Sequence, residues 1–147
     1  MLTRRRLLTG LLGSLLTPLR AWAQPLPPSN LGVIGMAVAY DNSVTVNVTG
    51  TTVTTAAFTI SSGANRAALC CITAFQGITG VSVSVGGVAG TLLQSSASSD
   101  VQLWQVIAPP TGSQTATASW AESVTVSLGV ITATGVDQTT PCNNNAV

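Results

Sequence analysis

The stretch that decides the fold is Val81-Ser82-Val83-Ser84-Val85-Gly86-Gly87-Val88. Its valines alternate with serines, so one face of an extended strand is apolar and the other carries hydroxyl groups. The Gly86-Gly87 pair predicts a two-residue turn, because glycine tolerates the positive φ angles of a type I′ turn. A second strand, Val88–Leu93, then returns beside the first, and the stretch as a whole predicts an antiparallel hairpin.

The same two-residue period recurs at residues 44–49, and other segments are rich in β-branched or apolar residues. We expect further strands at residues 44–49, 51–60, 67–75, 101–107, 115–119 and 123–134, with turns rich in Gly, Pro, Ser and Asn between them. No segment after residue 23 combines a 3.6-residue period with helix caps. About eight short strands of this kind predict an all-β fold, an antiparallel β-sandwich of the jelly-roll or immunoglobulin-like type.

The core is expected to form from the apolar phase of these strands. Its predicted members are Val44, Val46, Val48, Leu69, Val83 and Val126. The segment Ala67–Phe75 is apolar at nearly every position, which is typical of a central strand that is buried on both faces.

The first 23 residues have the order of an export signal. A basic start with Arg4 and Arg5 precedes a short leucine-rich stretch, and Ala21 and Ala23 flank the expected cleavage site before Gln24. The apolar stretch is too short for a permanent membrane span. Thr3 followed by the arginines and two leucines resembles a twin-arginine signal, and the alternative is an ordinary secretory signal. We expect a cleaved signal helix, contact with a membrane only before cleavage, and a periplasmic, cell-surface or extracellular protein.

Residues 24–147 are enough for one domain. Residues 24–30 contain three prolines and predict a stiff linker. We expect the β-sandwich at residues 31–141 and a short polar tail at residues 142–147.

Charge is scarce in this chain, which has no lysine and no histidine. After the signal, one arginine faces four carboxylates, which gives a formal charge of −3. Such a surface cannot neutralise a phosphate backbone, so nucleic acid is not an expected partner. The missing residues also exclude a Ser-His-Asp triad, a Cys-His pair and a lysine Schiff base. We expect a protein that is not an enzyme and needs no cofactor.

The four carboxylates are Asp41, Asp100, Glu122 and Asp137. A carboxylate pair can hydrolyse glycosidic bonds, and clustered carboxylates bind calcium. Their spacing matches no calcium loop, so we expect Asp41, Asp100 and Asp137 to shape turns and we expect no metal site. A carboxylate-based hydrolase remains the third functional hypothesis.

The three cysteines are Cys70, Cys71 and Cys142. Adjacent residues on a strand point to opposite faces, so Cys70 and Cys71 are poor partners for each other. Either Cys142 pairs with Cys70 or Cys71, or the adjacent cysteines are small apolar core residues. An odd number of cysteines leaves at least one free thiol.

Three aromatic residues are candidates for ligand binding, namely Trp120, Trp104 and Tyr40. Aromatic faces pack on the apolar face of a sugar ring, which favours carbohydrate or another surface polymer as the ligand. The alternative for both tryptophans is core packing, which the apolar neighbours favour for Trp104.

Several motifs together resemble a Val/Thr/Gly-rich β-sandwich module of large bacterial secreted and surface proteins. They are Gly63-Ala64-Asn65-Arg66, Val85-Gly86-Gly87-Val88, Leu103-Trp104 with Ala108-Pro109-Pro110-Thr111-Gly112, and Gly135-Val136-Asp137-Gln138-Thr139-Thr140-Pro141. The resemblance covers about residues 40–141 and brings no catalytic residue with it. Larger members add strands after the last motif, which implies a minimal sandwich whose edge is completed by another copy.

These observations predict an exported, non-enzymatic β-sandwich that binds carbohydrate or another surface polymer. The alternative is a self-assembling subunit of a surface layer or fibre. In that case residues 31–39 of one copy add as a strand to another copy, or else they cover the edge of their own chain. Few charges and no lysine leave little to oppose such association.

Overall fold

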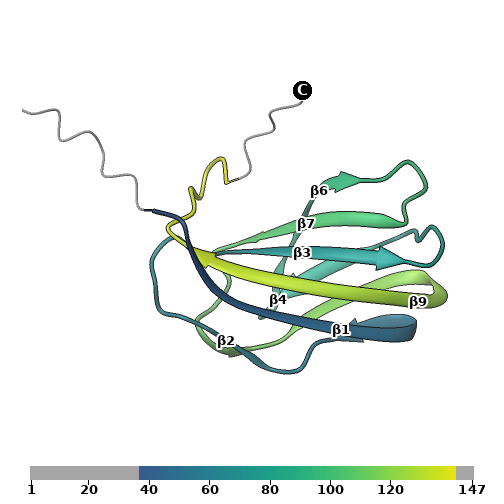
Figure 1. The fold of residues 1–147 in the computed structure, drawn as a ribbon, viewed down its shortest axis with the longest axis horizontal. Coiled ribbons are helices and arrows are strands. Elements are labelled where there is room, and N and C mark those ends of the chain that lie inside the picture. Colours follow the sequence, from purple (N-terminus) through teal and green to yellow (C-terminus); the bar gives the residue numbers. More distant parts are fainter. Residues whose placement is uncertain (1–36, 142–147) are drawn as a thin grey trace, which may run out of the picture. The chain divides into compact units, whose positions relative to one another are not determined.

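The computed structural model describes residues 37–141, and this part of the chain is an antiparallel β-sandwich (Figure 1). Its nine strands are β1 (Ala39–Thr54), β2 (Phe58–Ile60), β3 (Ala67–Ala74), β4 (Ser82–Val85), β5 (Val88–Ala89), β6 (Thr91–Ser95), β7 (Val101–Ile107), β8 (Gly112–Gln114) and β9 (Ala116–Thr134). Within residues 37–141 no helix is long and apolar enough to cross a membrane. The predicted signal peptide, linker and polar tail lie outside the described residues.

A long antiparallel ribbon of β1 and β9 is the spine of the fold. It runs from the pair Ala39 and Thr134 to the pair Thr54 and Thr117, with an irregularity between Gly50 and Thr52. On its other edge, β9 pairs with β4 through its first residues and with β3 through its last residues. One strand therefore belongs to both layers, and the sheet curls around the core.

The first layer contains β1, the second half of β9, β3, β7 and β6, which lie side by side in Figure 1. The second contains the first half of β9 with β4 and β5, and β2 and β8 form a separate two-stranded sheet. The predicted all-β sandwich is confirmed, although two of its strands are long rather than short.

The Gly86-Gly87 hairpin is also confirmed. The two glycines have φ angles of 57° and 80°, and Val85 pairs with Val88 across them. The returning strand is shorter than predicted, because Gly90 separates β5 from β6 and donates its N–H to the Val83 carbonyl at 2.8 Å.

The core contains most of the valines that the period predicts. Val83 and Val126 are buried, and a half-buried row on β1 packs against the buried cluster. That row is Val44, Val46 and Val48. The prediction for Leu69 is wrong, since 38 % of its surface is exposed.

The error at Leu69 has a simple cause in β3. This strand alternates buried residues with exposed ones, because within the described residues a second layer covers only one of its faces. The expectation of a strand buried on both faces is therefore wrong as well. Its outward side chains lie on an open sheet surface instead.

Candidate binding surface

The open surface is formed by the outward side chains of β1, β9, β3 and β7, and we call it the outer face. The pairing register places these residues in rows across the strands, with Leu69 between Ile131 and Gln105, and Cys71 between Gly129 and Leu103. The side chains that share this face are Ser43, Thr45, Asn47, Thr49, Ala67, Leu69, Cys71, Thr73, Val101, Leu103, Gln105, Ile107, Thr125, Ser127, Ile131 and Ala133. None of them is charged.

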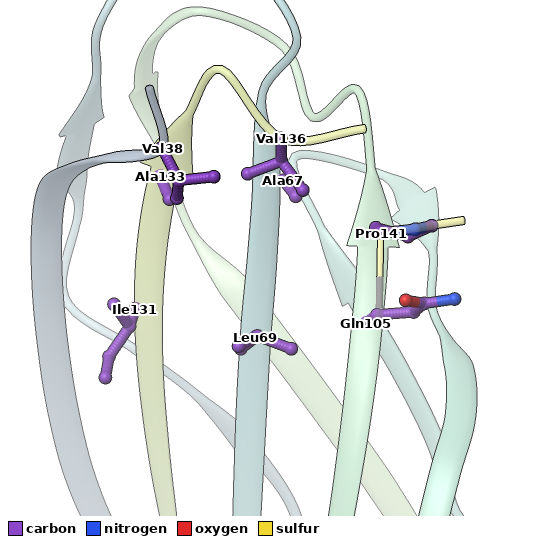
Figure 2. Close-up of a pocket in the computed structure, with 8 residues that line it drawn as sticks. All are labelled: Val38, Ala67, Leu69, Gln105, Ile131, Ala133, Val136 and Pro141. Atoms are coloured by element: carbon purple, nitrogen blue, oxygen red, sulfur yellow. The ribbon is translucent and has the colours of Figure 1, made fainter. Parts of the chain in front are cut away.

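An apolar pocket of about 160 Å³ lies at one end of the outer face (Figure 2). Its lining residues are Val38, Ala67, Leu69, Gln105, Ile131, Ala133, Val136 and Pro141. Val136 and Pro141 come from the segment that follows β9. The N–H groups of Gly135 and Val136 donate to the carbonyls of Ala64 and Asn65, at 3.0 and 2.9 Å, and hold this segment in place.

One polar atom in this pocket has no partner. The Gln105 Oε1 atom is buried, and within residues 37–141 no hydrogen-bond donor reaches it. A buried amide oxygen without a donor is costly. A hydroxyl or N–H group of a ligand would remove that cost if the Gln105 side chain turned its oxygen toward the ligand.

The three aromatic residues that were predicted to bind a ligand do not lie on one surface. Tyr40 is 67 % exposed, and its hydroxyl donates to the Ser43 Oγ at 3.2 Å. Trp120 is only 5 % exposed, and its Nε1 donates to the Gly50 carbonyl at 2.9 Å. Its predicted role as an exposed ring is therefore wrong, because the ring packs in the core.

Trp104 lies on the inner side of β7, opposite Cys70, and packs half-buried against the core. Its Nε1 donates to the Gln102 Oε1 at 3.1 Å. This position agrees with the core alternative for Trp104. Tyr40 is thus the one candidate among the three that has a largely open ring.

Each of the four carboxylates accepts hydrogen bonds from groups near it. Asp41 accepts from the Ser61 N–H and the Thr132 hydroxyl, Asp100 from the Ser98 hydroxyl, and Glu122 from the N–H and hydroxyl of Thr79. Asp137 accepts from the N–H groups of Thr139 and Thr140 at 2.7 and 3.1 Å. In the described part of the chain, no group of three His, Cys, Asp or Glu residues gathers to hold a metal ion.

These bonds lower the pKa of three carboxyl groups. Burial raises the pKa of Asp41, but hydrogen bonds from Ser61 and Thr132 outweigh it and leave a pKa below 3.8. Bonds from the Thr79 side chain and backbone lower the pKa of Glu122 below 4.5. The N–H groups of Thr140 and Thr139 lower the pKa of Asp137 below 3.8.

Stability is therefore expected to be lost on the acid side. A carboxyl group whose pKa is lowered by folding stabilises the protein fully above its unfolded pKa, and less as the pH falls toward its folded pKa. No histidine titrates near neutrality. Calorimetry should give a Tm that is flat from about pH 6 to 8 and falls below about pH 4. The Glu122→Gln variant should show a smaller fall, and a Tm that rises on acidification would contradict this account.

The two adjacent cysteines, Cys70 and Cys71, differ sharply in burial. Cys70 is fully buried, and burial, with a smaller contribution from Cys71, raises the pKa of its thiol to about 12. Cys71 is exposed on the outer face. Cys142 lies outside the described residues, so its pairing with Cys70 or Cys71 stays a prediction.

We expect this difference to appear in thiol chemistry. In a Cys142→Ser variant, iodoacetamide should alkylate Cys71 in the folded protein, because its thiol is exposed and the reagent can reach it. Cys70 should react only after denaturation. Peptide mapping by mass spectrometry measures both sites, and the Cys71→Ser, Cys142→Ser double variant is the control. Alkylation of Cys70 in the folded state would contradict the placement of β3.

Comparison of the chain with protein-family models, curated proteins and solved structures found no match. The resemblance to the Val/Thr/Gly-rich module therefore stays a prediction that rests on its motifs. One of these motifs, residues 135–141, supplies Val136 and Pro141 to the pocket.

Proposed function

We propose that the chain is an exported, non-enzymatic β-sandwich that binds an uncharged polysaccharide at the cell surface through its outer face. The observation that carries this proposal is the composition of that face. It combines an apolar pocket at one end with hydroxyl and amide side chains at the other, and it has no charged group.

The two ends of the outer face suit the two kinds of surface on a sugar. The C–H faces of a pyranose pack on apolar side chains such as Leu69 and Ile131, with the exposed ring of Tyr40 on the neighbouring strand. Sugar hydroxyls bond the side chains of Thr45, Asn47 and similar residues. The Gln105 Oε1 would accept one more hydroxyl only after a movement of its side chain, because the atom is buried. A charged polymer would have nothing to pair with on this face.

Binding to insoluble polysaccharides and a glycan array, with residues 24–147, tests the proposal. We expect retention on at least one uncharged polymer, with cellulose and chitin as the probes. Ile131→Asp should weaken binding about tenfold or more, because it places a charge on the apolar end, and tenfold corresponds to 1.4 kcal/mol. Ile131 is 52 % exposed, so the fold tolerates the change.

Phe75→Asp is the matched control, since Phe75 is 91 % exposed and does not line the pocket. It should bind like the unchanged protein. Retention on none of the polymers, or equal retention of the Ile131→Asp variant, would overturn the proposal.

A second candidate function is self-assembly at the surface. The observation that favours it is the free edge of β1, along which no strand pairs within residues 37–141.

A further inference from the structure

We infer that two copies of the chain pair through the free edge of β1, antiparallel, around a two-fold axis at Val46. The inference deepens the self-assembly candidate by naming the partner and the register. It does not depend on polysaccharide binding.

The edge of β1 offers unpaired backbone groups. Within the described residues, β1 pairs with β9 alone. The Ser43 N–H donates to the Asn42 Oδ1 at 2.8 Å and not to β9. Successive residues of a strand turn their N–H and C=O groups to alternate sides. Thr45, Asn47 and Thr49 therefore direct theirs away from β9, toward the free edge.

Between the two irregularities of β1, at Tyr40/Asn42 and at Gly50/Thr52, the features that usually protect an edge are missing. β1 has no lysine, arginine or proline along its 16 residues, and its single charge is Asp41 near the start. Exposed edges in natural sheets are normally blocked by such residues, by bulges or by a covering segment. Near the start of β1, the Asn42 Nδ2 donates to the Thr59 carbonyl of β2 at 2.9 Å.

The inner valines of β1 support an added strand. Val44, Val46 and Val48 pack against the core, yet they stay half-buried because they lie at the margin of the sandwich. A strand placed beside β1, with its own valines on the inner side, would bury them further. Burial of apolar area stabilises an interface by about 25 cal/mol per Å² before the cost of association.

The sequence of β1 indicates that the added strand is β1 of a second copy. Residues 43–49 read Ser-Val-Thr-Val-Asn-Val-Thr, which has the same pattern in both directions around Val46. In antiparallel pairing about that residue, Val44 lies opposite Val48 and Thr45 lies opposite Asn47. Valines meet valines on the inner side, and polar side chains meet on the outer side. Two-fold symmetry needs this kind of self-complementary surface.

Charge does not oppose the arrangement. The register places Asp41 of one copy opposite Thr51 of the other, so ten residue steps separate the two Asp41 positions. At about 3.4 Å per residue this is about 34 Å. Screening in physiological salt acts over about 8 Å, so the two carboxylates do not repel each other appreciably.

Sedimentation of residues 24–147 over a wide concentration range is the test. We expect a reversible dimer. Thr45→Glu and Asn47→Lys should each weaken it about tenfold or more, because equal charges become diagonal neighbours about 7–8 Å apart across the axis. An equimolar mixture of the two variants should restore dimers, since residue 45 of one copy lies opposite residue 47 of the other. Thr73→Lys, on the outer face but in the centre of the sheet, is the control and should dimerise normally.

The mixture distinguishes this register from other modes of association. Circular dichroism and Tm establish that each variant is folded. If one variant does not fold, the dimerisation of the other is compared with that of Thr73→Lys. A monomer at all concentrations would overturn the inference. A dimer that survives both substitutions would also overturn it. A dimer that disappears only when residues 24–36 are removed would overturn it as well, because the contact would then belong to that preceding segment. Failure to bind polysaccharide leaves this result unchanged, because sedimentation without polysaccharide measures association alone and the binding test changes Ile131, which lies outside the β1 edge.

Discussion

Replacing Trp120 with alanine is expected to destabilise the fold by ~3–5 kcal/mol. The indole ring is 5 % exposed and belongs to the core cluster. Its Nε1 also donates to the Gly50 carbonyl at 2.9 Å, where the pairing of β1 with β9 is interrupted. The variant loses the packing of the ring and leaves that carbonyl without its donor. Domains of this kind are stable by about 5–15 kcal/mol, so the expected loss is a large share.

Urea unfolding followed by circular dichroism measures this effect. Trp120→Phe keeps most of the packing but loses the hydrogen bond, so a smaller loss of about 1–3 kcal/mol is expected. Phe75→Ala is the matched control, because Phe75 is 91 % exposed and its removal should change stability by about 0.5 kcal/mol or less. An alanine variant as stable as the unchanged protein would contradict the buried position of Trp120.

Local sequence signals were sufficient to predict the hairpin and most strands. The Gly86-Gly87 turn depends only on backbone freedom at two residues, so its prediction needs no knowledge of distant strands. The alternation in β4 and in residues 44–49 of β1 is likewise visible within a few residues. The all-β class follows from these local patterns.

Long-range pairing explains where the strand predictions failed. The sequence predicts separate strands at 115–119 and 123–134, but β9 runs continuously through Trp120 because β1 and β4 pair with its first half. At residues 51–60 one predicted strand is divided in the structure, because β1 ends at Thr54 and β2 begins at Phe58. There the Thr55 N–H donates to the Ala116 carbonyl, and the Thr55 hydroxyl accepts from the Ala116 N–H, both at 2.9 Å.

The pocket could not be predicted from the sequence. Leu69, Gln105 and Ile131 come from three strands, and only the register of β3 with β7 and β9 makes them neighbours. Leu69 gave one weak signal, because it lies on the opposite phase from Cys70 and Ile72. An apolar stretch without alternation does not show which phase faces solvent, so both phases were expected in the core.

Export is expected to depend on the paired arginines in a nearly all-or-none way. Changing both Arg4 and Arg5 to lysine should abolish transport by the twin-arginine route, although the net charge of the signal stays the same. Arginine and lysine differ in geometry and hydrogen bonding, so a receptor that reads a paired-arginine motif distinguishes them. The full-length precursor should then accumulate in the cytoplasm, whereas the unchanged protein should be found outside it with Gln24 as its first residue.

Cell fractionation with mass spectrometry of the N-terminus measures this outcome. Arg6→Lys is the matched control, because Arg6 occupies the variable position of the motif and its change should leave export intact. Equal export of the Arg4→Lys, Arg5→Lys double variant would leave the ordinary secretory signal as the route. The two routes differ physically, since the general secretory channel threads an unfolded chain and the twin-arginine system moves a folded one. This difference affects the proposed pairing through the free β1 edge. A chain that folds before export would form its dimer before it reaches the surface.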